Sequence, residues 1–272
     1  MVKRWAGALV KVLAVGALAV SAVGFTTVSS GELPGTNIRT SLDGESVRLS
    51  MPSGDGTPKG VALWFHGQGG NANNRVESPF LEALRRDGWV IASSDFHSTS
   101  WGNPESTEDT RRLINWAQAQ TGLEVKLWVS GSMGGAVTLN ALNFGIEAPP
   151  CWYGVKPAIS LTQMDRVPGG PRFIESAYAG PVPPDRDPVR NLGTLPISTR
   201  YRVVASEADH WVIYDENTAP LILALSLIGA DVSLLEATGL HEDPSHWNAD
   251  DLKKFANSCV DGGEGSFAEA SN

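Results

Sequence analysis

A serine in a short, glycine-containing turn is the first residue in this sequence that suggests chemistry. Ser132 lies within Ser130-Gly131-Ser132-Met133-Gly134, after an apolar run and before a segment with the composition of a helix. A nucleophile at a sharp turn from strand to helix needs small residues two positions before and two positions after it, because the backbone folds tightly there. Ser130 and Gly134 meet this requirement. A glycine-rich turn that merely opens a helix is the alternative, since such short patterns also arise by chance.

A second glycine-rich turn precedes this one in the chain. Residues 66–70 read His-Gly-Gln-Gly-Gly and follow the continuous apolar run 61–65. Glycine allows the backbone to approach a reacting group closely, and backbone N–H groups held in such a loop can stabilise developing negative charge. A plain glycine turn is the alternative.

Candidates for an acid and a base lie after two later apolar runs. A serine nucleophile needs a base that accepts its proton and an acid that orients the base. Glu207 and Asp209 follow the run 202–205, and His241 and His246 follow the run 232–235. The residue types therefore permit a Ser-His-acid site, with two candidates for each of the other two positions.

These residues must be positioned by an alternation of strands and helices. Loose alternation predicts an early strand at 45–51, and short, mostly apolar runs predict strands at 61–65, 89–93, 127–129, 155–161, 202–205 and 232–235. Helical spacing predicts helices at 79–86, 107–121, 136–142, 217–228 and 249–256. Such alternation is typical of an α/β protein with a mainly parallel sheet, in which ligands bind beyond the carboxyl ends of the strands. Pro157 makes the pairing of the strand that contains it less certain.

With this order of motifs the chain resembles the α/β-hydrolase superfamily, as a secreted esterase-like or lipase-like member, over about residues 47–255. The resemblance implies a mainly parallel central sheet with helices on both faces. It also implies a short lid or loop insertion after the sixth strand, where the Pro- and Gly-rich stretch 162–199 lies. The family order is Ser, then Asp or Glu, then His. Ser132, Asp209 and His241 are therefore the expected catalytic residues, with Glu207 and His246 as alternatives.

The same resemblance assigns the oxyanion hole. In the family one donor is the N–H of the residue after the nucleophile, here Met133, and the other comes from the His-Gly loop. Gln68 is the expected second donor, with Gly67 as the alternative. His66 is expected to hold the loop by hydrogen bonds rather than to act as the base.

The implied function is a secreted serine hydrolase, and most specifically a carboxylic-ester hydrolase that forms an acyl-enzyme. The expected substrate is a small-molecule or polymeric ester, and no cofactor is required. Lipase, thioesterase, peptidase and polyester depolymerase activities use the same parts, and the sequence does not choose between them. A metal-dependent hydrolase is one alternative, with possible ligands in Asp95, His97, Asp209, His210, His241 and His246. A non-catalytic exported binding protein on the same scaffold is the other.

Several aromatic residues and a histidine are expected near the same rim. His97 follows the run 89–93 and is a candidate for a pocket-lining residue. Tryptophans in predicted loops are candidates for an apolar acyl or aromatic subsite, namely Trp101, Trp152, Trp211 and Trp247.

The N-terminal residues and the composition indicate the expected location, domain boundaries and partners of the protein. Residues 1–22 contain three bases, no acid and an apolar stretch, which is the pattern of a secretory signal peptide. We expect a linker at 23–44, a catalytic domain at 45–260, and a disordered tail at 261–272. The 272 residues carry a net charge of −9, which argues against nucleic-acid binding. A secreted monomer without stable membrane insertion after signal cleavage is therefore expected.

The two cysteines are separated by most of the C-terminal half of the chain. Cys151 and Cys259 would form one long-range disulfide in an oxidising compartment, and two separate buried thiols are the alternative.

Overall fold

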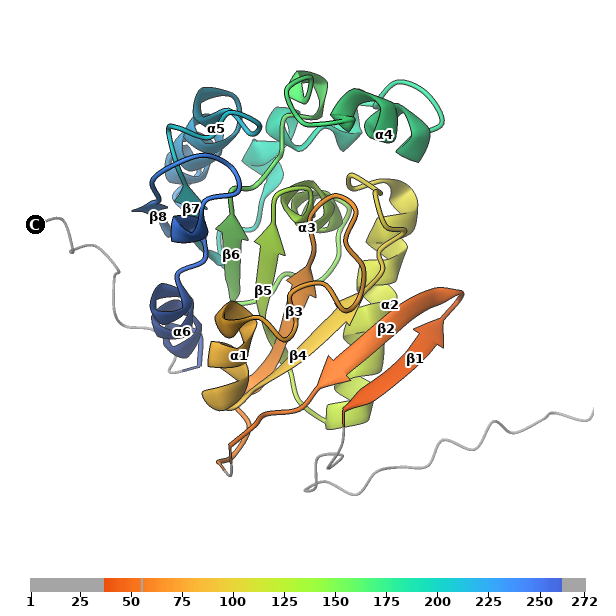
Figure 1. The fold of residues 1–272 in the computed structure, drawn as a ribbon, viewed down its shortest axis with the longest axis vertical. Helices are drawn as coiled ribbons and strands as arrows, with labels where there is room; N and C mark the ends of the chain where they lie inside the picture. Colours follow the sequence, from red (N-terminus) through yellow and green to blue (C-terminus); the bar gives the residue numbers. More distant parts are fainter. Residues whose placement is uncertain (1–36, 55, 261–272) are drawn as a thin grey trace, which may run out of the picture. The chain divides into compact units, whose positions relative to one another are not determined.

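A twisted sheet runs through the part of the chain that the structure describes (Figure 1). The computed structural model describes residues 37–54 and 56–260. Within these residues the strands are β1 (Ile38–Leu42), β2 (Glu45–Ser50), β3 (Gly60–Phe65), β4 (Trp89–Ser94), β5 (Val125–Gly131), β6 (Cys151–Val155), β7 (Arg200–Ala205) and β8 (Val232–Glu236). Their order in the sheet is β1-β2-β4-β3-β5-β6-β7-β8. The pairs β1–β2 and β2–β4 are antiparallel and the other pairs are parallel, so the predicted mainly parallel sheet is confirmed.

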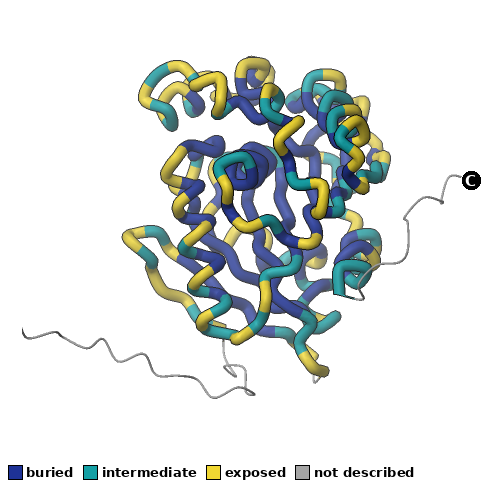
Figure 2. The backbone as a smooth tube through the Cα atoms, turned by 180° about the vertical axis from the view of Figure 1, so that it is seen from behind, coloured by how far each residue is buried: buried dark blue, intermediate teal, exposed yellow. Residues whose placement is uncertain are grey.

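Helices cover both faces of this sheet, as predicted. They are α1 (Pro79–Arg86), α2 (Pro104–Thr121), α3 (Gly134–Asn143), α4 (Gly170–Ala177), α5 (Tyr214–Leu227) and α6 (Ala249–Ser258). One apolar core joins the sheet to α2, α3 and α5, and a second core on the opposite face joins it to α1 and α6. Alternation along β3 explains the two layers, because Leu63 and Phe65 enter the first core while Ala62 and Trp64 enter the second. Figure 2 shows the central strands as buried along their lengths.

The longest helix illustrates how local sequence sets the element boundaries. The side chain of Asn103 accepts a hydrogen bond from the N–H of Ser106, and Pro104 occupies the first turn, where its missing N–H costs nothing. Gly122 ends the helix in the left-handed conformation with φ of 67°. Helix α2 therefore begins slightly before the predicted residue 107 and ends where its glycine stop predicts.

The sixth strand lies earlier than predicted, and the prediction of a strand over 155–161 was wrong. Strand β6 is Cys151–Val155, whose five residues are all buried. Lys156 follows with a positive φ of 44°, and Pro157 has no N–H to continue the ladder, so pairing stops there. The stretch from there to β7 is the insertion after the sixth strand. It contains α4 and several short 3-10 turns, so it is not wholly an extended loop.

The sheet also begins earlier than expected. Part of the predicted linker at 23–44 forms strand β1, which pairs with β2 from Ile38 opposite Leu49 to Leu42 opposite Glu45. Composition alone favoured a linker because only the two end residues of β1 are even partly buried. The expected signal peptide, the start of the linker and the tail at 261–272 lie outside the described residues. Among the helices that the structure describes, none is both long and apolar enough to span a bilayer.

The predicted disulfide is present and ties the last helix to the sheet. Cys151 begins β6, Cys259 follows α6, and the bond joins residues 108 positions apart. Both cysteines pack with the core on the α1 and α6 face. The bond therefore fixes the C-terminal helix against the middle of the sheet.

Candidate active site

The turn that carries Ser132 has a strained backbone, and its side chain is partly buried. Ser132 has a φ of 52°, in the left-handed region that non-glycine residues rarely adopt. Its N–H donates to the carbonyl O of Val155 at 3.0 Å, and its own carbonyl O accepts from the N–H groups of Gly135 at 2.8 Å and Ala158 at 3.0 Å. These bonds to β6 and α3 hold the turn in place, and the serine side chain is left at the end of β5.

Close packing behind the turn explains its small residues. A Cβ atom on Gly134 would lie 2.4 Å from the carbonyl O of Phe65, which no side chain can tolerate without movement. At the other expected small position Ser130 is accommodated, although its buried Oγ has no hydrogen-bond partner among the described residues. The requirement for a small residue is therefore strict after Ser132 and looser before it.

The loop at 66–70 lies directly against this turn. A Cβ atom on Gly67 would be 3.5 Å from the Cβ of Ser132. The N–H groups of Gln68 and Met133 donate no hydrogen bond to another described residue, so both are free to bind an oxyanion. The Gln68 side chain instead donates to the carbonyl O of Pro168 at 2.9 Å, which joins the loop to the insertion.

His66 stands behind the loop, as expected, and does not line the cavity at Ser132. Its Nε2 lies 2.9 Å from the carbonyl O of Asp95, and its Nδ1 lies 2.8 Å from the carbonyl O of Gly67. Burial lowers the pKa of His66, so the ring is neutral near pH 7 and can donate to only one of these oxygens at a time. A Cβ atom on Gly70 would lie 2.6 Å from this ring, which explains the last glycine of the motif.

Asp209 and His241 are brought together beyond the ends of β7 and β8. Asp209 Oδ2 lies 2.8 Å from His241 Nδ1, and both residues are buried. Asp209 Oδ1 accepts hydrogen bonds from the N–H groups of Trp211 at 2.9 Å and Val212 at 3.0 Å. Burial raises the pKa of Asp209, but the hydrogen bonds from His241 and the two N–H groups outweigh it and hold the pKa below its usual value. Asp209 is thus a charged carboxylate that fixes the imidazole.

The two alternative residues are placed differently. Glu207 is exposed on the same loop, and the carboxylate bonded to His241 is that of Asp209. His246 is fully buried, and its Nδ1 lies 3.1 Å from the carbonyl O of Asp243. It does not line the cavity that contains Ser132, whereas His241 does.

A single cavity of about 310 Å³ joins the nucleophile turn to the histidine. It is lined by Ser132 and His241, by three tryptophans, by residues of the oxyanion loop and of the insertion, and by charged side chains. Those used below are Trp64, Trp211, Trp247, Arg75, Lys156 and Glu242. Among the hydrogen bonds of residues 37–54 and 56–260, none joins Ser132 Oγ to His241.

The aromatic predictions are confirmed for two tryptophans and wrong for two. Trp211 packs against His241 with tilted rings whose centroids are 4.9 Å apart, and Trp247 forms a wall of the cavity. Trp101 and Trp152 are instead completely buried in the core on the α2, α3 and α5 face. Trp152 lies in β6, so the misplaced strand explains its wrong assignment to a loop.

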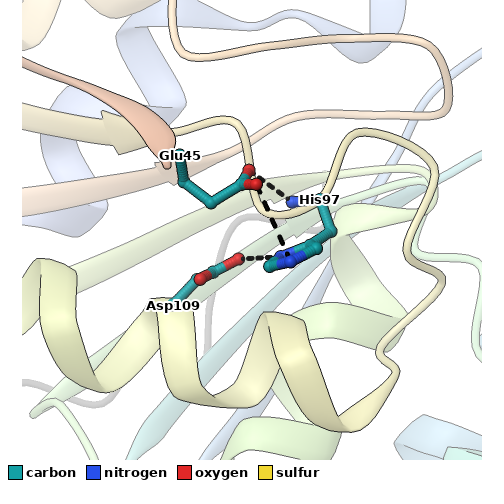
Figure 3. Close-up of side chains that lie close together, drawn as sticks. All are labelled: Glu45, His97 and Asp109. Carbon is teal, nitrogen blue, oxygen red and sulfur yellow. Dashed lines mark hydrogen bonds and ion pairs between the residues drawn. The ribbon is translucent and has the colours of Figure 1, made fainter. Parts of the chain in front are cut away.

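The residues considered for a metal site do not form one cluster. Among the described residues, the His, Cys, Asp and Glu side chains close enough to share an ion are Glu45, His97 and Asp109, and Figure 3 shows them together. Of these only His97 was a candidate, and it does not line the cavity at Ser132.

The geometry of this cluster is that of an ion pair. His97 Nδ1 lies 2.6 Å from Asp109 Oδ2, and Nε2 lies 3.7 Å from Glu45 Oε1, so each ring nitrogen faces its own carboxylate (Figure 3). Burial lowers the pKa of His97, but the hydrogen bond to Asp109 and the charge of Glu45 outweigh it and raise the pKa above its usual value.

The two cationic residues of the cavity were missed by sequence reasoning. Arg75 lies in the loop between β3 and α1, and Lys156 directly follows β6. The position of Lys156 immediately after a buried strand was a usable signal once the strand is placed at Cys151–Val155. Arg75 had no such signal, because it lies ten residues beyond the end of its strand.

Comparison with solved structures places this arrangement among known folds. No family model matches the sequence, and no curated protein matches it. A fluorophosphonate-binding serine hydrolase of Staphylococcus aureus is similar with a TM-score of 0.67 at 13% identity, covering 83% of this chain and 98% of that chain. An α/β serine hydrolase without a lid from Xanthomonas campestris is similar with a TM-score of 0.57 at 19% identity, covering 85% and 96%.

A third similar structure is part of a larger protein. The puromycin-hydrolyzing peptidase of Mycobacterium tuberculosis is similar with a TM-score of 0.63 at 15% identity, covering 83% of this chain. This chain spans only 39% of the length of that peptidase. The likeness at these identities concerns the fold, and it agrees with the strand order and the two helical layers. The chain has the α/β-hydrolase fold.

Proposed function

We propose that this protein is a secreted serine hydrolase that cleaves carboxylic esters through an acyl-enzyme. The observation that supports this most is the cavity in which Ser132, at its strained turn, faces the same space as His241, whose Nδ1 is bonded to the buried Asp209. A nucleophile, a base and an acid that orients the base are thereby available at one place.

The proposed reaction has two halves. Ser132 Oγ attacks the ester carbonyl carbon while His241 accepts its proton, and the N–H groups of Met133 and Gln68 bind the resulting oxyanion. The protonated His241 then gives its proton to the leaving alcohol, and the acyl group stays on Ser132. Water attacks the acyl-enzyme by the same route, with His241 first taking and then returning a proton, and the carboxylic acid leaves.

The cavity favours an ester over a peptide as substrate. The cavity is small, with about 310 Å³, and its walls include three tryptophans, so it suits one compact acyl group rather than an extended chain. The Cys151–Cys259 disulfide supports the proposal of secretion, because such bonds persist in oxidising compartments.

Turnover of a short p-nitrophenyl ester tests the proposal. Ser132→Ala is expected to reduce kcat by on the order of 10⁶-fold and to abolish labelling by a fluorophosphonate. Asp209→Asn is expected to reduce kcat by about 10³- to 10⁴-fold, because the imidazole loses its orientation and the stabilisation of its protonated form.

Glu207→Gln is the matched control for the acid, since it removes a carboxylate from the same loop without touching His241. It should leave kcat within about twofold of the wild type, the scatter expected of surface changes. An unchanged rate in Ser132→Ala would refute the proposed function. Equal losses in the two acid variants would refute the role of Asp209.

A further inference from the structure

Two cationic side chains face the cavity of Ser132 without a carboxylate partner. In the part of the chain that the structure describes, neither Arg75 nor Lys156 takes part in an ion pair. Other arginines of this acidic protein are paired, as Arg202 is with Asp251 at 2.6 Å and Arg48 is with Glu77 at 2.7 Å. The two cavity cations therefore have unused capacity for an anion.

The ring of Trp247 brings the two charges together near the nucleophile. The Cζ of Arg75 lies 3.8 Å from the ring centroid, and the Nζ of Lys156 lies 5.1 Å from it. Edge contacts with Trp64 at 6.2 Å and Phe80 at 5.2 Å fix this ring. The ring also abuts the nucleophile turn, because a Cβ atom on Gly131 would lie 3.2 Å from it. Two cations thus share one aromatic wall directly beside Ser132.

Lys156 has a second contact that links it to the base. Its Nζ donates a hydrogen bond to the carbonyl O of His241, and the side chain is 4% exposed. Burial lowers the pKa of Lys156 to about 8, and the charge of Arg75 adds to this effect. The amine is therefore still mostly protonated near pH 7, but no carboxylate of the described residues is in contact with its charge. This favours the binding of an added anion.

Two carboxylates also act on these cations and set the charge balance. The charge of Asp209 raises the pKa of Lys156 and so offsets only part of the effect of burial. Asp209 is also bonded to His241, which becomes positive during the proposed reaction. Glu242 is exposed at the cavity and acts on both Arg75 and Lys156 without an ion-pair contact to either. At the rim of the cavity the negative charge of Glu242 thus faces the two positive charges of Arg75 and Lys156. The cavity can therefore accept one additional negative charge.

We propose that Arg75 and Lys156 bind a carboxylate of the substrate, so that the preferred substrate is a small ester whose acyl chain ends in a free carboxylate. This inference rests on the proposed function, because it names the substrate class of the same site. A guanidinium matches the planar carboxylate with two parallel hydrogen bonds. The cavity volume of about 310 Å³ leaves room for a short methylene spacer against the tryptophans.

A pair of substrates that differ only in charge tests this inference. The p-nitrophenyl monoester of adipic acid ends in a carboxylate, and the p-nitrophenyl ester of adipamic acid ends in a neutral amide of nearly the same size. The wild type is expected to prefer the anionic ester in kcat/KM, mainly through a lower KM. Higher ionic strength should reduce the preference, because salt screens the partly exposed Arg75.

Variants of opposite sign make the test specific. Arg75→Gln should reduce the preference by about tenfold, the usual order for a hydrogen bond to a charged group, while turnover of the neutral ester is retained. Glu242→Gln should increase kcat/KM for the anionic ester. Arg111→Gln removes an exposed arginine on α2 that does not line the cavity, and it should leave kcat/KM unchanged for both esters. Lys156 is left intact in these variants because it also holds the backbone of His241.

The outcomes separate this inference from the proposed function. If neither ester is hydrolysed, or Ser132→Ala hydrolyses both unchanged, the proposed function fails. If both esters are hydrolysed in a Ser132-dependent manner without preference for the anion, only the inference about the carboxylate fails. A preference that survives Arg75→Gln unchanged would also overturn it.

Discussion

Replacing Gly134 by alanine should impair catalysis far more than it impairs folding. This glycine is the first residue of α3 and follows Met133, whose N–H is the proposed oxyanion donor. A Cβ atom at this position would lie 2.4 Å from the carbonyl O of Phe65 and 3.0 Å from that of His66. Both atoms belong to the backbone at the end of β3, so no side-chain rotation relieves the contact.

The size of the effect follows from the displacement that is needed. Ordinary contact begins at 3.4 Å, so the start of α3 must move away from β3 by about 1 Å. A misplacement of about 1 Å in a catalytic group reduces the rate by on the order of 10²-fold. The overpacking itself costs about 1–3 kcal/mol of unfolding free energy. We therefore expect Gly134→Ala to remain folded and to lose about two orders of magnitude in kcat.

The assay is kcat for a p-nitrophenyl ester, measured well below the midpoint of thermal unfolding, together with the rate of fluorophosphonate labelling. Gly193→Ala is the matched control, because a Cβ atom there meets nothing within 4 Å and its φ lies outside the left-handed region. A Gly134→Ala variant with kcat close to the wild type would refute the argument that β3 packing sets the oxyanion geometry.

Two further predictions concern stability. Reduction of the Cys151–Cys259 bond, which closes a loop of 108 residues, should lower the free energy of unfolding by about 5 kcal/mol in the loop-entropy description. Urea unfolding with and without reductant measures this, and a difference below about 1 kcal/mol would contradict it. His97 has a pKa raised above 6.5, so its stabilising effect is complete below that pH and is lost as the pH rises through the raised pKa. The difference in Tm between the wild type and His97→Gln should be larger near about pH 6 than near about pH 9, and a constant difference would argue against it.

The fold, and the gathering of Ser132, Asp209 and His241 at one edge of the sheet, were accessible from sequence because their signals are local. Strands β5, β7 and β8 end one, four and five residues before Ser132, Asp209 and His241, and parallel strands bring such ends together at one edge of the sheet. The bond between Asp209 and His241 then depends only on two adjacent strands, β7 and β8. Local patterns and sheet topology together are enough to predict this part.

The features that were missed depend on contacts between distant segments. The sixth strand was predicted too late in the chain because Trp152 and Tyr153 did not stand out as part of a strand. The apolar residues that follow, up to Leu161, are also buried, but they lie in the insertion. Arg75 and Lys156 meet at Trp247, which lies in a third segment. No periodicity in the sequence encodes such a meeting, since it depends on how three loops pack.

The position of the disulfide has a consequence for how the chain withstands proteolysis. The insertion between β6 and β7 has exposed residues around Pro181 and Asp185, where a protease can cut the chain. Such a cut separates the segment with Ser132 from the segment with Asp209 and His241. Because Cys151 precedes the cut and Cys259 follows it, the two fragments remain covalently joined. A nicked molecule can thus keep Ser132, Asp209 and His241 in one unit, and its fragments would separate only when the bond is reduced.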